Sequence, residues 1–221
     1  MFEPIRFELV KREDKDKINK LTENTWEWGD YTPELFEKWV NEGLFIKAIS
    51  NEEIVGIIHA RIFDDFAWFE GVRVKQEIRR KGIGKALAKK AMEMSGKSVF
   101  RLAANEKNVP SIQLAKALGF KEIDRFYYVE GKDYNYEKIV EEFNLKETNY
   151  DLKYVKGFVN DWVWYPIEKY NGKIYANNDL ILLETDPPFL VKGYIEGIRH
   201  MSRNFVSNSE GFIVFELNKQ K

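Results

Sequence analysis

The sequence of 221 residues has no cysteine, two histidines and no apolar run near the roughly 20 residues that span a membrane. Without cysteine there are no disulfides, no thiolate metal sites and no Cys–His nucleophile. His59 and His200 stand far apart without further ligands nearby, so a packed or solvated side chain is favoured for each. No G-x-S-x-G turn supports a serine nucleophile. These absences set aside triad hydrolases and predict no metal.

The chain also lacks an excess of one charge, since 35 Lys and Arg face 36 Asp and Glu. This balance argues against a general nucleic-acid-binding surface, so any attraction for a polyanion must be local. Hydrophobic residues make up 44% of the chain, which indicates a folded core. The opening MFEPIRFELV alternates like a strand and shows no signal-peptide pattern. We therefore expect a cytoplasmic protein without a membrane partner.

Hydrophobic periodicity predicts the order β-α-α-β-β-β-α-β-α-β over the first 131 residues. The expected helices are 14–26, 32–43, 83–95 and 110–119, and the expected strands are 5–14, 44–50, 53–63, 67–75, 98–105 and 120–131. Thr32 is the expected cap of the second helix, with Pro33 at the first helical position. The apolar stripe of the third expected helix contains Ile83, Leu87, Ala91 and Met94, and this helix ends at Gly96.

From about residue 132 the composition shifts to Asp, Tyr, Asn and Glu, with short strand-like runs at 161–167, 173–184 and 211–217. We expect two domains, 1–131 and 132–221, the second a small mixed or mostly β extension. Residues 187–205 are a candidate helix that Gly193 and Gly197 weaken. Three roles compete for the extension: a lid over the functional site of the first domain, a dimerisation element giving a homodimer, and a degenerate second copy of the first fold.

The segment RRKGIG, residues 79–84, lies between an alternating strand pattern and a helical pattern. Such a turn directs backbone N–H groups toward an anion at the positive end of a helix dipole. Residues 73–97 carry nine cations and two anions, a local charge of +7, which favours a polyanionic ligand over a solvated rim. We expect that a side chain at Gly82 or Gly84 would fill the space of the anion. Ala86 and Leu87 break the Walker and dinucleotide patterns.

What fits instead is R-x-x-G-x-G, with Arg79, Gly82 and Gly84, and it resembles the pyrophosphate loop of the GNAT superfamily of N-acetyltransferases. A second stretch, NVPSIQLAKALGF at 108–120, is similar to that family's N-x-x-A-x-x-L-Y-x-x-x-G-F helix, with Ser111 in the alanine place. The resemblance covers about residues 4–130. It implies an α+β fold in which helices flank a central mixed, mostly antiparallel sheet.

The resemblance further implies acetyl-CoA as cosubstrate. Its pantetheine arm would pair with the strand at Val72, Arg73 and Val74. Its pyrophosphate would take the backbone amides of Arg79, Arg80, Lys81, Gly82, Ile83, Gly84 and Lys85. Asn108 and Ser111 are further candidates for the coenzyme site, although Asn108 is equally a helix cap before Pro110.

Direct attack by an amine needs a base, an oxyanion donor and a protonated leaving group. Glu70 is the candidate base, against the alternative of a glutamate paired with a local cation. The resemblance implies the backbone N–H of Val72 as oxyanion donor. Ala115 stands where the family has its tyrosine acid, so water, Tyr127 or Tyr128 is left to protonate the thiolate, with packing the alternative role of both tyrosines.

Trp26, Trp28, Tyr31 and Trp39 cluster where the family builds its acceptor pocket. Core packing, a wall for an apolar acceptor and a cage for a cation compete here, and core packing leads for Trp39. For the whole chain we favour an N-acetyltransferase acting on an amine of a small molecule or protein. The alternatives are an acyl-CoA-binding sensor without catalysis and a nucleic-acid contact at the basic segment.

Overall fold

A computed structural model describes residues 4–27 and 29–219. By spatial contact the chain divides into two compact units. Unit 1 comprises Met1–Arg101, Leu114–Phe120 and Glu216–Lys221, and unit 2 comprises Leu102–Gln113 and Lys121–Phe215. These units do not follow sequence order, because unit 2 takes residues on both sides of position 131; the domain boundary expected there stays a prediction.

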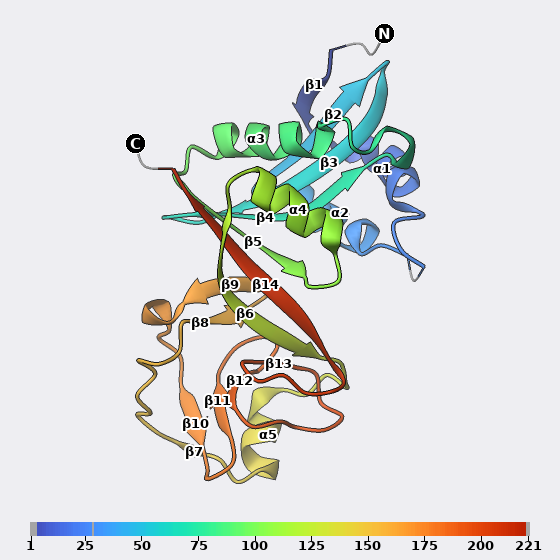
Figure 1. Ribbon diagram of the computed structural model, residues 1–221. Helices are drawn as coiled ribbons and strands as arrows, with labels where there is room; N and C mark the ends of the chain where they lie inside the picture. The colour runs from blue at the N-terminus through green and yellow to red at the C-terminus, as the bar shows by residue number, and fades with distance from the viewer. Residues whose placement is uncertain (1–3, 28, 220–221) are drawn as a thin grey trace. The chain divides into compact units, whose positions relative to one another are not determined.

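Unit 1 is built on antiparallel strands in the order β1-β2-β3-β4 (Figure 1). Its elements are β1 (Arg6–Leu9), α1 (Lys15–Thr22), α2 (Thr32–Asn41), β2 (Leu44–Ser50), β3 (Glu53–Ile62), β4 (Ala67–Val74) and α3 (Ile83–Ser95). Strand β5 (Val99–Asn105) and helix α4 (Val109–Ala117) are divided between the units. The predicted order of elements up to residue 131 is confirmed.

Helices cover both faces of the unit 1 strands. A Cβ at Gly56 of β3 would point at Leu87 and Ile83 of α3. The next residue, Ile57, packs in a buried cluster with residues of α1 and α2. Because neighbouring residues of a strand point to opposite faces, α3 lies on one face and α1 with α2 on the other.

The helix ends follow local chemistry. Gly82 (φ +83°) and Gly96 (φ +64°) flank α3 in the left-handed conformation, so the predicted end at Gly96 is confirmed. The predicted stripe of α3 is wrong at one position: Met94 is 38% exposed, and Met92 is buried instead. Helix α2 already begins at Thr32, whose N–H and Oγ–H both donate to the Asp30 carboxylate. Asp30 therefore performs the capping expected of Thr32.

Unit 2 carries a mostly antiparallel set of strands in the order β14-β6-β13-β12-β11-β10-β7, with β8 and β9 forming a separate pair. Strands β12 and β13 are parallel. The elements are β6 (Lys121–Val129), α5 (Tyr136–Glu142), β7 (Lys146–Glu147), β8 (Gly157–Asn160), β9 (Val163–Pro166), β10 (Ile174–Ala176), β11 (Ile181–Leu183), β12 (Phe189–Lys192), β13 (His200–Ser202) and β14 (Ser209–Asn218). Residues 216–218 of β14 belong to unit 1.

The candidate helix at 187–205 is wrong. The segment forms β12 and β13, because Gly193 (φ +89°) and Gly197 (φ +73°) adopt a backbone conformation that no α-helix contains. Helix α5 was not predicted; it begins where the Asn135 side chain accepts a hydrogen bond from the Lys138 N–H. Within residues 4–27 and 29–219, no helix combines the length and apolar character needed to cross a membrane. The predicted α+β class with mostly antiparallel strands is confirmed.

Candidate functional site

The glycine turn before α3 has the shape expected of an anion loop. Gly82 is left-handed, and a Cβ there would meet no atom within 4 Å. Arg79 is anchored to the preceding strand, since its Nε donates to the Val74 carbonyl at 3.0 Å. The Ala86 N–H donates to the Gly82 carbonyl, so the amides of residues 83–85 fall in the first turn of α3. Such amides have no acceptor inside their own helix and are open to a ligand.

Gly84 corrects part of the expectation. Its missing Cβ faces Leu114 Cδ2 at 3.4 Å, Val74 at 3.7 Å and Val72 at 3.8 Å, which are ordinary van der Waals distances. The space beside Gly84 is therefore filled by apolar side chains and not kept open for an anion. A small residue here serves the packing of α3 on β4 and α4.

The two glycines should respond differently to alanine. Gly82→Ala places a side chain at positive φ and should lower the free energy of unfolding by about 1–2 kcal/mol. Gly84→Ala introduces neither strain nor overlap and should change it by less than about 0.5 kcal/mol. Urea denaturation of both variants measures this, and a larger loss at Gly84 than at Gly82 would contradict the described packing.

Strand β4 contains a bulge at the candidate catalytic residues. Ile57 of β3 pairs with Arg73 of β4, and His59 pairs with Glu70. Between these two pairs β4 contains one residue more than β3, which is a β-bulge. Gly71 lies in the bulge with φ +64°, and a Cβ there would overlap the Trp39 ring. Glu70 and Val72 thus flank a backbone distortion that glycine permits and that interrupts the regular ladder.

Glu70 is paired with His59, for which the sequence favours a packed or solvated side chain. Its Oε1 lies 2.8 Å from His59 Nδ1, and His59 Nε2 lies 2.7 Å from the Glu42 carbonyl oxygen. The His59 side chain is fully buried, whereas that of Glu70 is 19% exposed. The alternative role expected for Glu70 is a pairing with a local cation; the side chain that pairs with Glu70 in the structure is a histidine. The sequence signal for this pair is one polar residue on each of two neighbouring strands. The two residues lie opposite each other only because of the bulge, which the sequence pattern does not give.

The aromatic residues before α2 surround a cation of the chain itself. The Arg73 guanidinium lies 4.3 Å from the Trp26 ring centroid and 4.9 Å from that of Tyr31. Its Nε donates to Asp30 Oδ2 at 2.6 Å and its Nη2 to Oδ1 at 3.2 Å. Burial alone would raise the pKa of Asp30, yet the hydrogen bond and charge of Arg73 lower it. The side chain of Arg73 therefore fixes the aromatic loop to β4, and coenzyme binding at Arg73 stays a prediction.

The expected aromatic cluster is otherwise partly realised. Trp39 is buried, as its predicted core position requires. Trp26 is half-buried and stacks on Tyr31. Trp28 lies outside the described residues. A hollow of about 500 Å³ adjoins this loop, lined by Asn19, Lys20, Thr22, Glu23, Gly29, Asp30 and Pro33.

Four further predicted site residues, Asn108, Ser111, Tyr127 and Tyr128, belong to unit 2. Asn108 Oδ1 accepts from the Ser111 N–H at 3.2 Å, so Asn108 caps α4. Tyr127 packs edge-on against Phe205, and Tyr128 packs against Trp162. Burial raises the pKa of Tyr128. Coenzyme binding by Asn108 and Ser111, and proton donation by either tyrosine, stay predictions.

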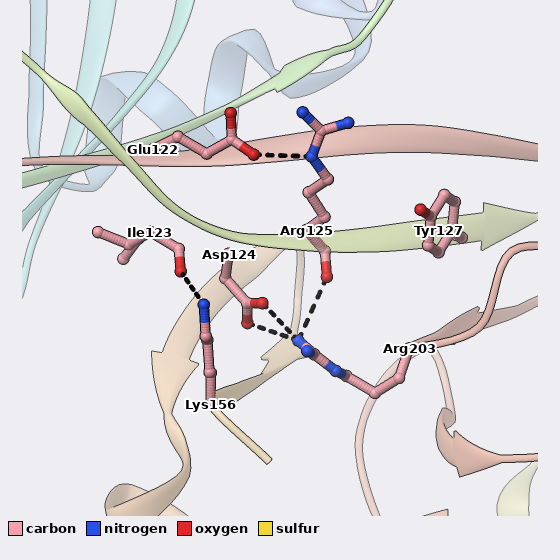
Figure 2. A pocket seen from close by; sticks show the side chains of 7 residues that line it. All are labelled: Glu122, Ile123, Asp124, Arg125, Tyr127, Lys156 and Arg203. Atoms are coloured by element: carbon pink, nitrogen blue, oxygen red, sulfur yellow. Dashed lines mark hydrogen bonds and ion pairs between the residues drawn. The ribbon is translucent and has the colours of Figure 1, made fainter. Parts of the chain in front are cut away.

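Unit 2 also has a polar pocket of about 480 Å³ on β6 (Figure 2). One face of it is an ion pair, in which Arg203 Nη1 lies 2.6 Å from both Asp124 oxygens. The buried Trp164 Nε1–H donates to the same carboxylate at 2.8 Å. Arg125 turns toward Glu122, away from this pair (Figure 2). The carboxylates here are bonded to cations of the pocket itself, which leaves no clear ligand preference.

Residues 15–120 match the sequence model of the acetyltransferase (GNAT) family. This stretch is a GNAT acetyltransferase domain. It contains the bulged strand β4, the glycine turn and α3. The enzyme class predicted from the two motifs, an acyltransferase, is therefore confirmed.

Solved structures show the same fold. A putative acetyltransferase from Thermoplasma acidophilum is 20% identical, covers 96% of this chain and 99% of its own, and gives a TM-score of 0.66. The ribosomal-protein-S18-alanine N-acetyltransferase from Escherichia coli is 12% identical, covers 99% of this chain and 96% of its own, and gives a TM-score of 0.53. Arabidopsis thaliana NAA60 in complex with acetyl-CoA is 20% identical, covers 56% of this chain and 90% of its own, and gives a TM-score of 0.50. No curated protein matches the sequence.

Proposed function

We propose that the GNAT domain transfers an acetyl group from acetyl-CoA to an amine, by direct attack of the amine on the thioester in a ternary complex. The observation that carries this is the bulge at Gly71, which sets Glu70 and Val72 on either side of a distorted backbone in the strand that leads into the glycine turn. The acetyl-CoA bound by the structural neighbour NAA60 supports the choice of cosubstrate.

The coenzyme would be held by backbone groups of the chain. The amides of residues 80–85 offer donors to its pyrophosphate, with Gly82 leaving open space beside them. The Arg79 amide does not contribute as expected, because the Arg79 N–H donates to the Gln76 carbonyl at 3.3 Å. Val72 and Val74 offer backbone groups of β4 to the pantetheine arm. The cations of the 79–85 segment add a favourable electrostatic field for a polyanion.

The chemistry then divides among few groups. An acceptor amine is mostly protonated at neutral pH, since a lysine amine has a pKa of about 10.4 and an α-amine of about 8. Glu70 accepts its proton, and the amine nitrogen attacks the thioester carbonyl carbon. The Val72 N–H stabilises the charge that develops on the carbonyl oxygen. The C–S bond breaks and leaves the electron pair on sulfur, while the second proton of the attacking nitrogen passes to water. Water can then protonate the thiolate, since the thiol has a pKa of about 8.5.

One observation favours a second function. Ala115 is buried at the place of the family's tyrosine acid, which fits a domain that binds acyl-CoA without turning it over. Calorimetric titration with acetyl-CoA, followed by thiol release with a panel of small amines, lysine peptides and free amino termini, separates the two. We expect micromolar binding and release with at least one class. Binding without release would favour the sensor, and no binding would remove both functions.

A further inference from the structure

The hydrogen bonds of His59 point to a role that goes beyond packing and rests on the proposed acetyl transfer. We propose that His59 stores the proton that Glu70 removes from the acceptor amine, so that the two residues work as a relay from the amine to Oε2, and from Oε1 to Nδ1. Glu70 is the catalytic residue. His59 acts through it, as a positioning residue.

The Glu42 carbonyl fixes which nitrogen of His59 carries a hydrogen. A carbonyl oxygen accepts hydrogen bonds and cannot donate them. Its distance of 2.7 Å from Nε2 therefore requires a hydrogen on Nε2. In a neutral ring this leaves Nδ1 with a bare lone pair.

That lone pair faces Glu70 Oε1, and Nδ1 and Oε1 lie 2.8 Å apart. The His59 side chain of this pair is fully buried. If the imidazole were neutral and the carboxylate ionised, two lone pairs would face each other at hydrogen-bond distance. One proton must therefore lie between Nδ1 and Oε1 in the resting protein. Whichever atom holds it, the pair as a whole has no net charge.

The surroundings of His59 suit a ring that becomes positive. Trp39 stacks on it with centroids 4.8 Å apart and planes at 10°, and Phe45 meets it edge to face at 5.9 Å. The ring face of Trp39, the carbonyl acceptor at Nε2 and the carboxyl partner at Nδ1 all interact favourably with a positive charge. Glu70 is the titratable group among these contacts of the ring.

An ammonium acceptor loses two protons on its way to the amide. The first passes to Glu70 Oε2 and frees the nitrogen lone pair, which forms the N–C bond. The proton already shared with Oε1 then moves onto Nδ1, so the pair gains one proton and one positive charge. As the C–S bond breaks and its electrons pass to sulfur, the second proton leaves the nitrogen for water, water protonates the thiolate, and the pair returns its own extra proton to solvent.

Two variants separate proton storage from simple orientation of Glu70. His59→Asn can place an amide N–H near the position of Nδ1, and His59→Gln can place one near that of Nε2, but neither amide takes up a proton. For a relay we expect both to lower kcat/KM for amine acetylation by about 100-fold, the lower range for lost acid–base catalysis. Combining His59→Asn with Glu70→Gln should add little to the loss from Glu70→Gln alone.

The matched control is His200→Asn, at the other buried histidine, whose Nδ1 lies 2.8 Å from the Ile198 carbonyl. It should leave kcat/KM unchanged, and acetyl-CoA titration of every variant tests for an intact coenzyme site. Two results would overturn the relay. One is full activity of His59→Asn together with lost activity of His59→Gln, and the other is full activity of both variants. Absence of turnover by the wild-type chain would instead overturn the proposed function itself, and the relay with it.

A readout independent of turnover tests the proton arrangement. In ¹⁵N-histidine-labelled protein, long-range ¹H–¹⁵N correlation spectra distinguish the tautomers of His59, with His200→Asn assigning the two rings. We expect a protonated Nε2 in the wild type. A bare Nε2 would overturn the relay even if amine acetylation proceeds.

Discussion

Replacing Glu70 by glutamine is expected to lower kcat/KM for amine acetylation by about 10²–10⁴-fold, the range for removal of a general base. Glutamine keeps the shape of the side chain and can donate its amide N–H to His59 Nδ1, so the fold and the hydrogen bond are retained. What it loses is the ability to accept a proton from an ammonium acceptor. The effect should fall on turnover, measured as thiol release, while acetyl-CoA affinity stays within about a factor of two.

A matched control is Glu52→Gln. Glu52 is also a glutamate in an ion pair, with Arg6 at 2.7 Å, but its side chain is 81% exposed. Its loss should leave both kinetics and stability nearly unchanged, because exposed pairs contribute little. Wild-type turnover by the Glu70 variant would show that the carboxylate is not the base. The amine would then have to reach the thioester already neutral.

The order of the elements in the first 131 residues could be predicted because its signals are local. Apolar runs mark β2 and β3, alternating apolar residues mark β4, and Gly96 ends α3 by its own conformational preference. The prediction of a helix at 187–205 was wrong because the apolar residues of this segment fit both the helical and the strand period. Gly193 and Gly197 decided the outcome through backbone angles that composition alone does not give.

The candidate site was predictable only where it is continuous in sequence. The glycine turn and Glu70 lie within one stretch, whereas the partners that define their chemistry come from elsewhere. Arg73 meets Asp30 across 43 positions of sequence. His59 meets Glu70 through a register that shifts by one residue at the bulge, so strict alternation would have misaligned them.

That dependence on the bulge makes Gly71→Ala the second variant with a large expected effect. Alanine at φ +64° is strained, and its Cβ would lie 2.6 Å from Cζ3 of the buried Trp39 ring and closer still to Cη2. Strain of about 1–2 kcal/mol and overpacking of about 1–3 kcal/mol together predict a loss of about 2–5 kcal/mol in the free energy of unfolding.

Gly96→Ala isolates the two contributions. Gly96 has the same φ of +64°, but a Cβ there meets nothing within 4 Å, so we expect the strain alone, about 1–2 kcal/mol. Because Trp39 stacks on His59, displacing its ring at Gly71 should also disturb the His59–Glu70 pair. Turnover by the folded Gly71 variant should therefore fall, whereas that of the Gly96 variant should not. Equal losses of stability and activity in both variants, by urea denaturation and thiol release, would mean that the bulge does not depend on its contact with Trp39.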